Sequence, residues 1–244
     1  VSLRAEGTLT VAVGALLDVS AGAWMRVGRE VVLGDAGRLT LVSGDLPGAT
    51  MVLGGRLAAY GARYGQSVSD GGTLEIDTYR LRLAASSGND GQTLVLGTER
   101  FLADGFSHFV LGGRSGVEVG DGTALSVRPQ PLARTLDGRV SRLAGGGDLS
   151  WAGLTTSERA WRGATSIALA ASSLTEGVLR VAAGARIEVD AGGRIALTGN
   201  SAVEIGGTLR APGGEIDIGM REPAFGEDYL GATIRLLAGA TVHA

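Results

Sequence analysis

The sequence contains no cysteine and no lysine, and it contains only two histidines. Without cysteine, neither a disulfide framework nor a thiolate metal site can form. Without lysine, the chain has no phosphate-binding loop of the usual kind and no Schiff-base amine. His108 and His243 leave little material for a multi-histidine metal site or a histidine triad. We expect His108 to be a loop residue or one that packs a loop.

Long hydrophobic runs are also absent. No segment approaches the roughly 18 continuous apolar residues of a membrane-spanning helix, so no membrane span is expected. The first ten residues are already repeat-like and do not resemble a signal peptide. Because the repeat stops in mid-pattern at Val242, we expect a segment of a longer chain. The lack of cysteine suits proteins that cross the periplasm unfolded, and it suits a reducing cytoplasm equally well.

Neither sign of charge is concentrated in one region. The formal net charge is −3, and 22 basic and 25 acidic residues are scattered along the chain. Nucleic-acid binding draws much of its free energy from counterion release at a basic surface. The sequence offers no such surface, so we expect no nucleic-acid partner.

What the sequence does contain is a short repeat of alternating apolar pairs. Between residues 187 and 218, the two members of each pair are separated by one residue, as on one face of a β-strand. Every third pair returns after about 21 or 22 residues. The returns run from Ile187 to Leu209, from Ile195 to Ile216 and, near the start of the chain, from Leu9 to Val31 and from Leu17 to Leu39.

A repeat of this length without helical segments predicts an all-β fold. We expect a right-handed, single-stranded parallel β-helix, a solenoid with about three short strands per rung and loop excursions. About nine or ten rungs fit the chain. Glycine supplies 42 residues, and its tolerance of positive φ suits the sharp turns at residues 192–193, 206–207 and 213–214.

The predicted solenoid is one domain with an interruption. Residues 1–128 are expected to form rungs with loops, including a loop at 97–109. The repeat fails in residues 129–166, which contain two prolines, a triple glycine and two tryptophans. We expect this stretch to be an irregular excursion packed on the rod. The rungs then continue through residues 167–244.

Paired carboxylates are the first candidates for catalysis, because some parallel β-helices are polysaccharide lyases or glycosidases, which need clustered acids. Three strands each carry two acids on one side, and the pairs are Glu75 with Asp77, Glu188 with Asp190, and Glu215 with Asp217. The alternative, which we favour, is a solvated outer strand face. The spacing predicts instead that Glu188 stacks on Arg210 and Arg194 on Glu215, outside the rod.

Two other features have a functional and a plain structural interpretation. Residues 88–91 and 120–122 resemble glycine-aspartate calcium turns, but such turns bind calcium only in tandem copies, so we expect ordinary turns. Trp151 and Trp161, with Arg159 and Arg162 nearby, could stack on a sugar or anchor a protein partner. They could equally pack the excursion onto the rod, and we favour that interpretation.

The sequence of the repeat resembles that of a known protein family. The segment IGGTLRAPGGEIDI at 205–218, with GFSHFVLG at 105–112 and VEVGDGTAL at 117–125, is similar to the shaft of filamentous haemagglutinin-like exoproteins. These are large adhesins of Gram-negative bacteria exported by two-partner secretion. The resemblance covers most of the chain. It does not extend to a secretion domain with Asn-Pro motifs, because neither Asn89 nor Asn200 precedes a proline.

The resemblance implies a right-handed β-helical shaft that a dedicated outer-membrane transporter exports. Such a shaft is secreted or displayed at the cell surface, and it mediates adhesion to host or neighbouring cells as a virulence factor. The implied partner is a surface receptor or glycan, and no catalysis, metal or cofactor is expected. A polysaccharide-binding or polysaccharide-degrading β-helix protein is one alternative. An autotransporter passenger is another, and it differs only in the export route.

Overall fold

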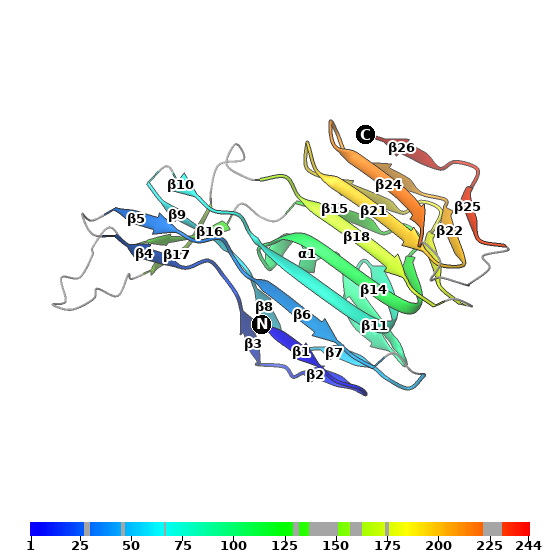
Figure 1. Ribbon diagram of the computed structural model, residues 1–244, viewed down its shortest axis with the longest axis horizontal. Helices are drawn as coiled ribbons and strands as arrows, with labels where there is room; N and C mark the ends of the chain where they lie inside the picture. Colours follow the sequence, from blue (N-terminus) through cyan, green and yellow to red (C-terminus); the bar gives the residue numbers. More distant parts are fainter. Residues whose placement is uncertain are drawn as a thin grey trace.

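The protein is built almost entirely from β-strands. The computed structural model describes residues 1–26, 30–44, 47–65, 67–128, 132–136, 151–156, 163–173, 176–221 and 231–244. In these ranges the only helix is α1 (Arg100–Ala103), and no helix is long and apolar enough to cross a membrane. The prediction of an all-β fold is confirmed, and most of the strands lie in parallel sheets (Figure 1).

Seven strands pair in parallel along a first ladder, which Figure 1 shows as a row across the molecule. Leu3 pairs with Leu41 and Leu41 with Ile76, so apolar residues form columns along the ladder. In the described residues this ladder has seven strands, where about nine or ten rungs are expected for the chain, and hairpins between the strands occupy much of the remaining sequence. The strands are β1 (Ser2–Arg4), β6 (Arg38–Val42), β11 (Gly72–Ala84), β14 (Phe106–Val119), β18 (Ser166–Ala171), β21 (Arg194–Gly199) and β24 (Glu215–Met220).

Two further parallel ladders follow the first in the C-terminal half. The second joins the ends of β11 and β14 to β19 (Val178–Val181), β22 (Ala202–Ile205) and β25 (Thr233–Leu236). The third consists of β15 (Ala124–Val127), β20 (Arg186–Val189), β23 (Thr208–Arg210) and β26 (Thr241–His243). From β14 to the end of the chain, each successive layer therefore contributes to the first, second and third ladders in turn.

The repeat read from the C-terminal sequence is confirmed by the register. Ile187 pairs with Leu209 in the third ladder, and Ile195 pairs with Ile216 in the first. No insertion separates these strands, so the spacing in the sequence equals the length of one layer.

The repeat read from the N-terminal sequence is wrong. Leu9 in β2 (Leu9–Val11) pairs with Met51 in β7 (Met51–Leu53), and Leu17 in β3 (Leu16–Asp18) pairs with Leu57 in β8 (Arg56–Ala58). Val31 instead lies in β5 (Val31–Leu33), antiparallel to β4 (Ala23–Met25). This inserted hairpin has short apolar strands of its own, which imitate the strands of a rung.

The hydrophobic core consists of apolar columns stacked from layer to layer. Val203 and Ile205 in β22 are fully buried, whereas their register partners Ile234 and Leu236 in β25 are 47% and 62% exposed. A layer is therefore buried by the layer that covers it, not by its own fold. Full burial of an aliphatic side chain contributes about 1.5 to 3 kcal/mol, so the columns supply most of the stabilisation.

An aromatic cluster closes the core where the sequence predicted a loop. Phe101 of α1 stacks on Phe109 of β14 with ring centroids 4.5 Å apart, and Phe106 packs edge-on against Phe109 at 6.1 Å. All three rings are buried. The predicted loop at 97–109 is thus wrong over much of its length, because these aromatic residues draw the chain into a helical turn and then a strand.

Glycines at the turns act in two different ways. Gly192 and Gly213 have φ of 75° and 61°, as the sequence predicted for sharp turns. Gly207 has no positive φ, but a Cβ there would lie 2.2 Å from the carbonyl oxygen of Ala185 in the neighbouring layer. Glycine is required at this position because the backbones of two layers approach closely.

A second body of strands lies beside the stack. β10 (Ser67–Val68), β9 (Gly61–Tyr64), β16 (Leu132–Leu136) and β17 (Trp151–Thr156) form one sheet, in which β9 and β16 are parallel. The β4–β5 hairpin lies against it through β5 (Figure 1). We call these six strands the lateral surface. Each of its hairpins leaves the stack before a strand of the first ladder.

The predicted excursion at 129–166 contributes two of these strands. Its described residues include the antiparallel pair β16 and β17 and the start of β18. Its two prolines, its triple glycine and Trp161 lie outside the described residues.

Candidate interaction surface

The three predicted acid pairs lie in different parts of the stack. Glu75 and Asp77 are on β11 in the middle of the first ladder, whereas Glu215 and Asp217 are on β24 at its end. Glu188 is on β20 in the third ladder. The structure therefore does not bring the pairs together. No group of three or more histidine or acidic side chains that could hold a metal ion occurs among the described residues.

Exposed arginines neutralise the outer acid pairs. Arg194 lies 3.3 Å from Glu215 and 3.2 Å from Asp217, and Arg38 lies 3.6 Å from Glu75. The predicted stacking of Arg194 on Glu215 is confirmed. Ion pairs this exposed contribute about 0 to 1 kcal/mol each, so they refine the register without determining the fold.

The surroundings of Asp77 perturb its protonation. Burial of the carboxylate, with the charge of Glu75 beside it, raises the pKa of Asp77, and Arg4 opposes the shift. Asp77 borders a hollow of about 640 Å³ together with Arg4 and Glu6. Glu75 accepts a hydrogen bond from the Thr40 hydroxyl at 3.0 Å and does not line this hollow. Glu6 is therefore the second carboxylate of this hollow, and Arg4 lies beside both acids along its lining.

Glu188 is the centre of a partly buried cluster of charges. Its carboxylate accepts hydrogen bonds from Arg128 at 2.5 Å and from Arg210 at 2.9 Å, and it forms an ion pair with Arg186 at 2.7 Å. Asp190 lies 3.4 Å from Arg128. The side chain of Glu188 is only 10% exposed. The predicted contact with Arg210 is confirmed, and the cluster ties three successive layers together on the outside of the third ladder.

The glycine-aspartate segment at 120–122 is a turn, as expected, but the segment at 88–91 is mostly a strand. Residues 88–90 form β12 (Gly88–Asp90), which makes a hairpin with β13 (Thr93–Gly97), and of this segment only Gly91 lies in the turn between them. Gly91 has a φ of 59° and Gly122 a φ of 65°, values that tight turns require and that glycine adopts without strain.

The histidines do not lie in a common site. His108 is in strand β14, so its assignment to a loop is wrong, and its Nδ1 lies 2.9 Å from the Ser166 hydroxyl on the neighbouring strand. His243 is in β26, where it pairs in register with Arg210. The two side chains therefore belong to different ladders.

The lateral surface carries exposed aromatic residues that the sequence reading missed. Trp24 on β4 is 51% exposed, and Tyr64 on β9 is 39% exposed. A Cβ on Gly34 would lie 3.4 Å from Cζ3 of Trp24, so the indole ring rests over Gly34. Trp24 lies between Gly22 and Gly28 in a stretch predicted to be a rung. These two glycines are the sequence feature that could have indicated a hairpin instead.

Of the two tryptophans considered for recognition, only one has a described backbone. Trp151 begins β17 of the lateral surface. Trp161, Arg159 and Arg162 lie outside the described residues.

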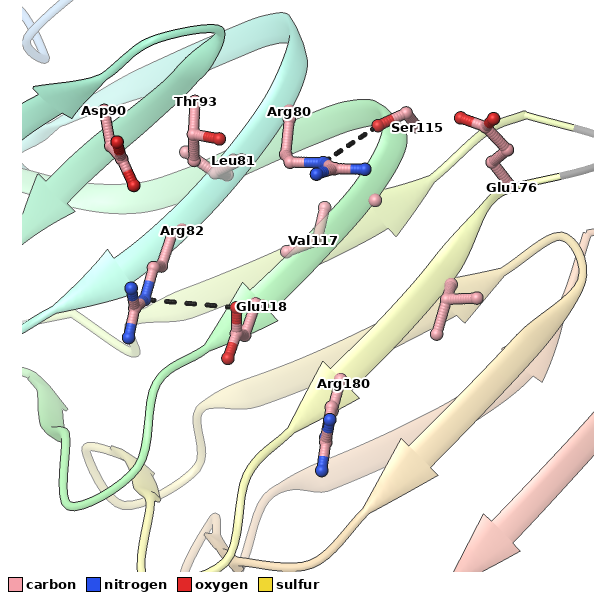
Figure 2. A pocket seen from close by; sticks show the side chains of 12 residues that line it. Arg80, Leu81, Arg82, Asp90, Thr93, Ser115, Val117, Glu118, Glu176 and Arg180 are labelled. Atoms are coloured by element: carbon pink, nitrogen blue, oxygen red, sulfur yellow. Dashed lines mark hydrogen bonds and ion pairs between the residues drawn. The ribbon is translucent and has the colours of Figure 1, made fainter.

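A shallow groove of about 420 Å³ lies on the outside of the second ladder, over β11, β14 and β19. Figure 2 shows Arg80 directed toward Ser115 and Arg82 toward Glu118, with Arg180 on the next strand. The Arg80 Nε donates to the Ser115 hydroxyl at 3.1 Å, and Arg82 lies 3.9 Å from Glu118. The groove therefore presents charged and polar side chains on a rigid sheet.

A second ionic contact holds the helical turn against the stack. Arg100 donates to the carbonyl oxygens of Leu53 at 3.0 Å and Gly55 at 3.2 Å, and it lies 3.3 Å from Asp104. Burial raises the pKa of the Asp104 carboxyl, although Arg100 favours the ionised form. The folded protein therefore binds the Asp104 proton more tightly than the unfolded chain does.

This difference predicts a pH dependence of stability. The stability that Asp104 contributes is fully present below its ordinary pKa of 3.8 and is lost as the pH rises through the higher folded value. Asp104→Asn should abolish this part of the decline while keeping the side-chain shape. Urea unfolding of both proteins from pH 3 upward tests this, and parallel profiles would contradict it.

Comparisons with protein-family models, with curated proteins and with solved structures give no match.

Proposed function

We propose that this chain is a structural and adhesive segment of a large secreted bacterial surface exoprotein of the filamentous haemagglutinin-like type. In this proposal the parallel ladders form a right-handed β-helical rod, which holds binding surfaces away from the cell. A dedicated outer-membrane transporter exports the parent protein, which is released or displayed at the outer membrane. The segment performs no catalysis.

The observation that carries this proposal is that the parallel ladders form a regular stack, while the exposed aromatic residues lie on hairpins beside that stack. The first ladder runs through seven parallel strands, with register shifts only near the ends of the β11–β14 pairing that it uses. Hairpins from distant parts of the sequence meet beside it in the lateral surface. Trp24 and Tyr64 are exposed there. Exposed tryptophan and tyrosine are the side chains that most often anchor protein partners, and their rings also stack on sugars.

The distribution of acids supports a binding role over a catalytic one. The acid pairs lie in separate ladders or layers, and arginines neutralise most of their members. A groove lined by arginines favours the second candidate, a polysaccharide-binding β-helix protein. An autotransporter passenger would have the same frame and location with a different export route.

An assay of cell adhesion and an assay of polysaccharide cleavage distinguish these functions. Beads coated with the protein should bind epithelial or bacterial cells saturably, and soluble protein should compete with the beads. Incubation with plant and bacterial polysaccharides should release no new reducing ends from either the wild-type protein or the Asp77→Asn variant. Reducing ends released by the wild type and abolished in the variant would overturn the proposal and favour a polysaccharide-degrading enzyme.

A further inference from the structure

The floor of the groove on the second ladder contains a glycine, Gly116, whose missing side chain leaves space for a ligand. Gly116 is the register partner of Arg80 on one side and of Val178 on the other, and all three lie on the outside of the sheet. Because Gly116 has no side chain, the column is hollow between an arginine and a valine. The hollow of about 420 Å³ is within the size range of sites that bind small ligands.

Charges of alternating sign continue along the neighbouring column. Arg82, Glu118, Arg180, Glu204 and Arg235 are successive register partners on the outside of the ladder. Arg82 pairs with Glu118 at 3.9 Å and Arg235 pairs with Glu204 at 3.7 Å. Arg180, in the middle of the column, forms no ion pair of 4.0 Å or less within the described part of the chain.

The groove thus holds guanidinium donors without a partner among the residues that the structure describes. Arg80 is exposed, and only its Nε donates to Ser115. Ser115 is buried, so this hydrogen bond fixes the position of the Arg80 guanidinium. Arg180 is exposed and faces the same groove. Two strand spacings of about 4.8 Å separate β11 from β19, so these donors stand on strands about 10 Å apart.

Acceptors flank the donors at the rim. Asp90 from the β12–β13 hairpin lies on one side in Figure 2, and Glu176 before β19 lies on the other, both exposed. Thr93 adds a hydroxyl beside Asp90. A ligand that satisfies this groove must offer an anionic group to arginine and hydroxyl donors to carboxylates.

We propose that this groove binds a carboxylated oligosaccharide of the uronate type. A sugar carboxylate would accept paired hydrogen bonds from Arg80 or Arg180, and its ring hydroxyls would donate to Asp90 and Glu176. One or two sugar rings would bridge the two arginine-bearing strands over Gly116 and Val178. A fully sulfated chain with few free hydroxyls suits the groove less, because the rim carboxylates would repel it. The inference rests on the proposed function for its setting, a surface glycan.

The test is isothermal titration calorimetry with a galacturonate trimer and its methyl ester, which differs only in the neutralised carboxylates. The wild-type protein should bind the acid trimer, and Arg80→Gln or Arg180→Gln should weaken binding about tenfold or more. Arg235→Gln is the matched control, since it removes the same charge from the same face outside the groove, and it should leave binding unchanged. Melting temperatures of the variants show whether these exposed substitutions preserve the fold.

The outcomes separate this inference from the proposed function. Equal binding of the ester, equal binding by the Arg180→Gln variant, or no binding to the wild type would overturn the groove inference. Uronate binding by a protein that does not adhere to cells would overturn the adhesive function while leaving the groove inference intact. Adhesion without uronate binding would do the reverse.

Discussion

Glu188→Gln should lower the free energy of unfolding by about 3 kcal/mol, at the lower end of the cost of breaking a buried ion pair. The glutamine keeps the shape of the side chain but removes the charge that three arginines share. Those arginines are 31% to 48% exposed, so water recovers part of the loss. The position of the carboxylate is only 10% exposed, so water cannot replace most of its contacts with the arginines.

Glu215→Gln is the matched control for this prediction. Glu215 also faces an arginine across a layer boundary, but it is 60% exposed, and its loss should cost less than about 1 kcal/mol. Guanidinium or urea unfolding followed by circular dichroism gives both values. Equal effects of the two substitutions would show that the Glu188 cluster is an ordinary surface contact.

Gly207→Ala should be at least as harmful as Glu188→Gln, although it adds only a methyl group. A Cβ at position 207 would lie 2.2 Å from the carbonyl oxygen of Ala185 and 2.8 Å from that of Ala182. Both obstacles are backbone atoms, so the layers must separate to make room. Overpacking costs about 1 to 3 kcal/mol where side chains can yield, and we expect about 3 kcal/mol or more here.

Gly219→Ala provides the comparison. Nothing lies within 4 Å of a Cβ at position 219, and its φ is not positive, so alanine should be tolerated or slightly stabilising. The thermal unfolding temperatures of the two variants decide the matter. A Gly207→Ala variant as stable as the wild type would mean that the layers do not approach as closely as described.

The sequence predicts the fold best where the layers are shortest. From Ile187 to Ile218 each layer follows the last without an insertion, so spacing alone gives the register. Near the start, an antiparallel hairpin has three-residue strands that are wholly apolar. Periodicity cannot distinguish so short an apolar run from the strand of a rung, because three residues are too few to show which face is buried. Val31 was therefore assigned to the ladder although it pairs with Met25.

The same limit applies to the charged residues. The contact between Glu188 and Arg210 follows from spacing because they occupy adjacent layers. Arg128 is 60 residues from Glu188, and the interval contains the excursion, so no period reveals their contact. The outer groove also depends on pairing across long insertions, since Gly116 meets Val178 across the same excursion. Contacts between segments that long insertions separate can be identified only from the folded structure, because the period of the repeat does not extend across the insertion.

The central claim of the proposed function is that the lateral surface binds cells through its exposed aromatic residues. We predict that Trp24→Ser combined with Tyr64→Ser reduces the adhesion of protein-coated beads to cells at least tenfold, because exposed aromatic anchors commonly contribute about 1 to 2 kcal/mol each. Val110→Ser, which removes a side chain 42% exposed on the first ladder, should leave adhesion unchanged. Full adhesion by the double variant, or equal loss in the Val110→Ser control, would contradict a binding surface carried by the lateral hairpins.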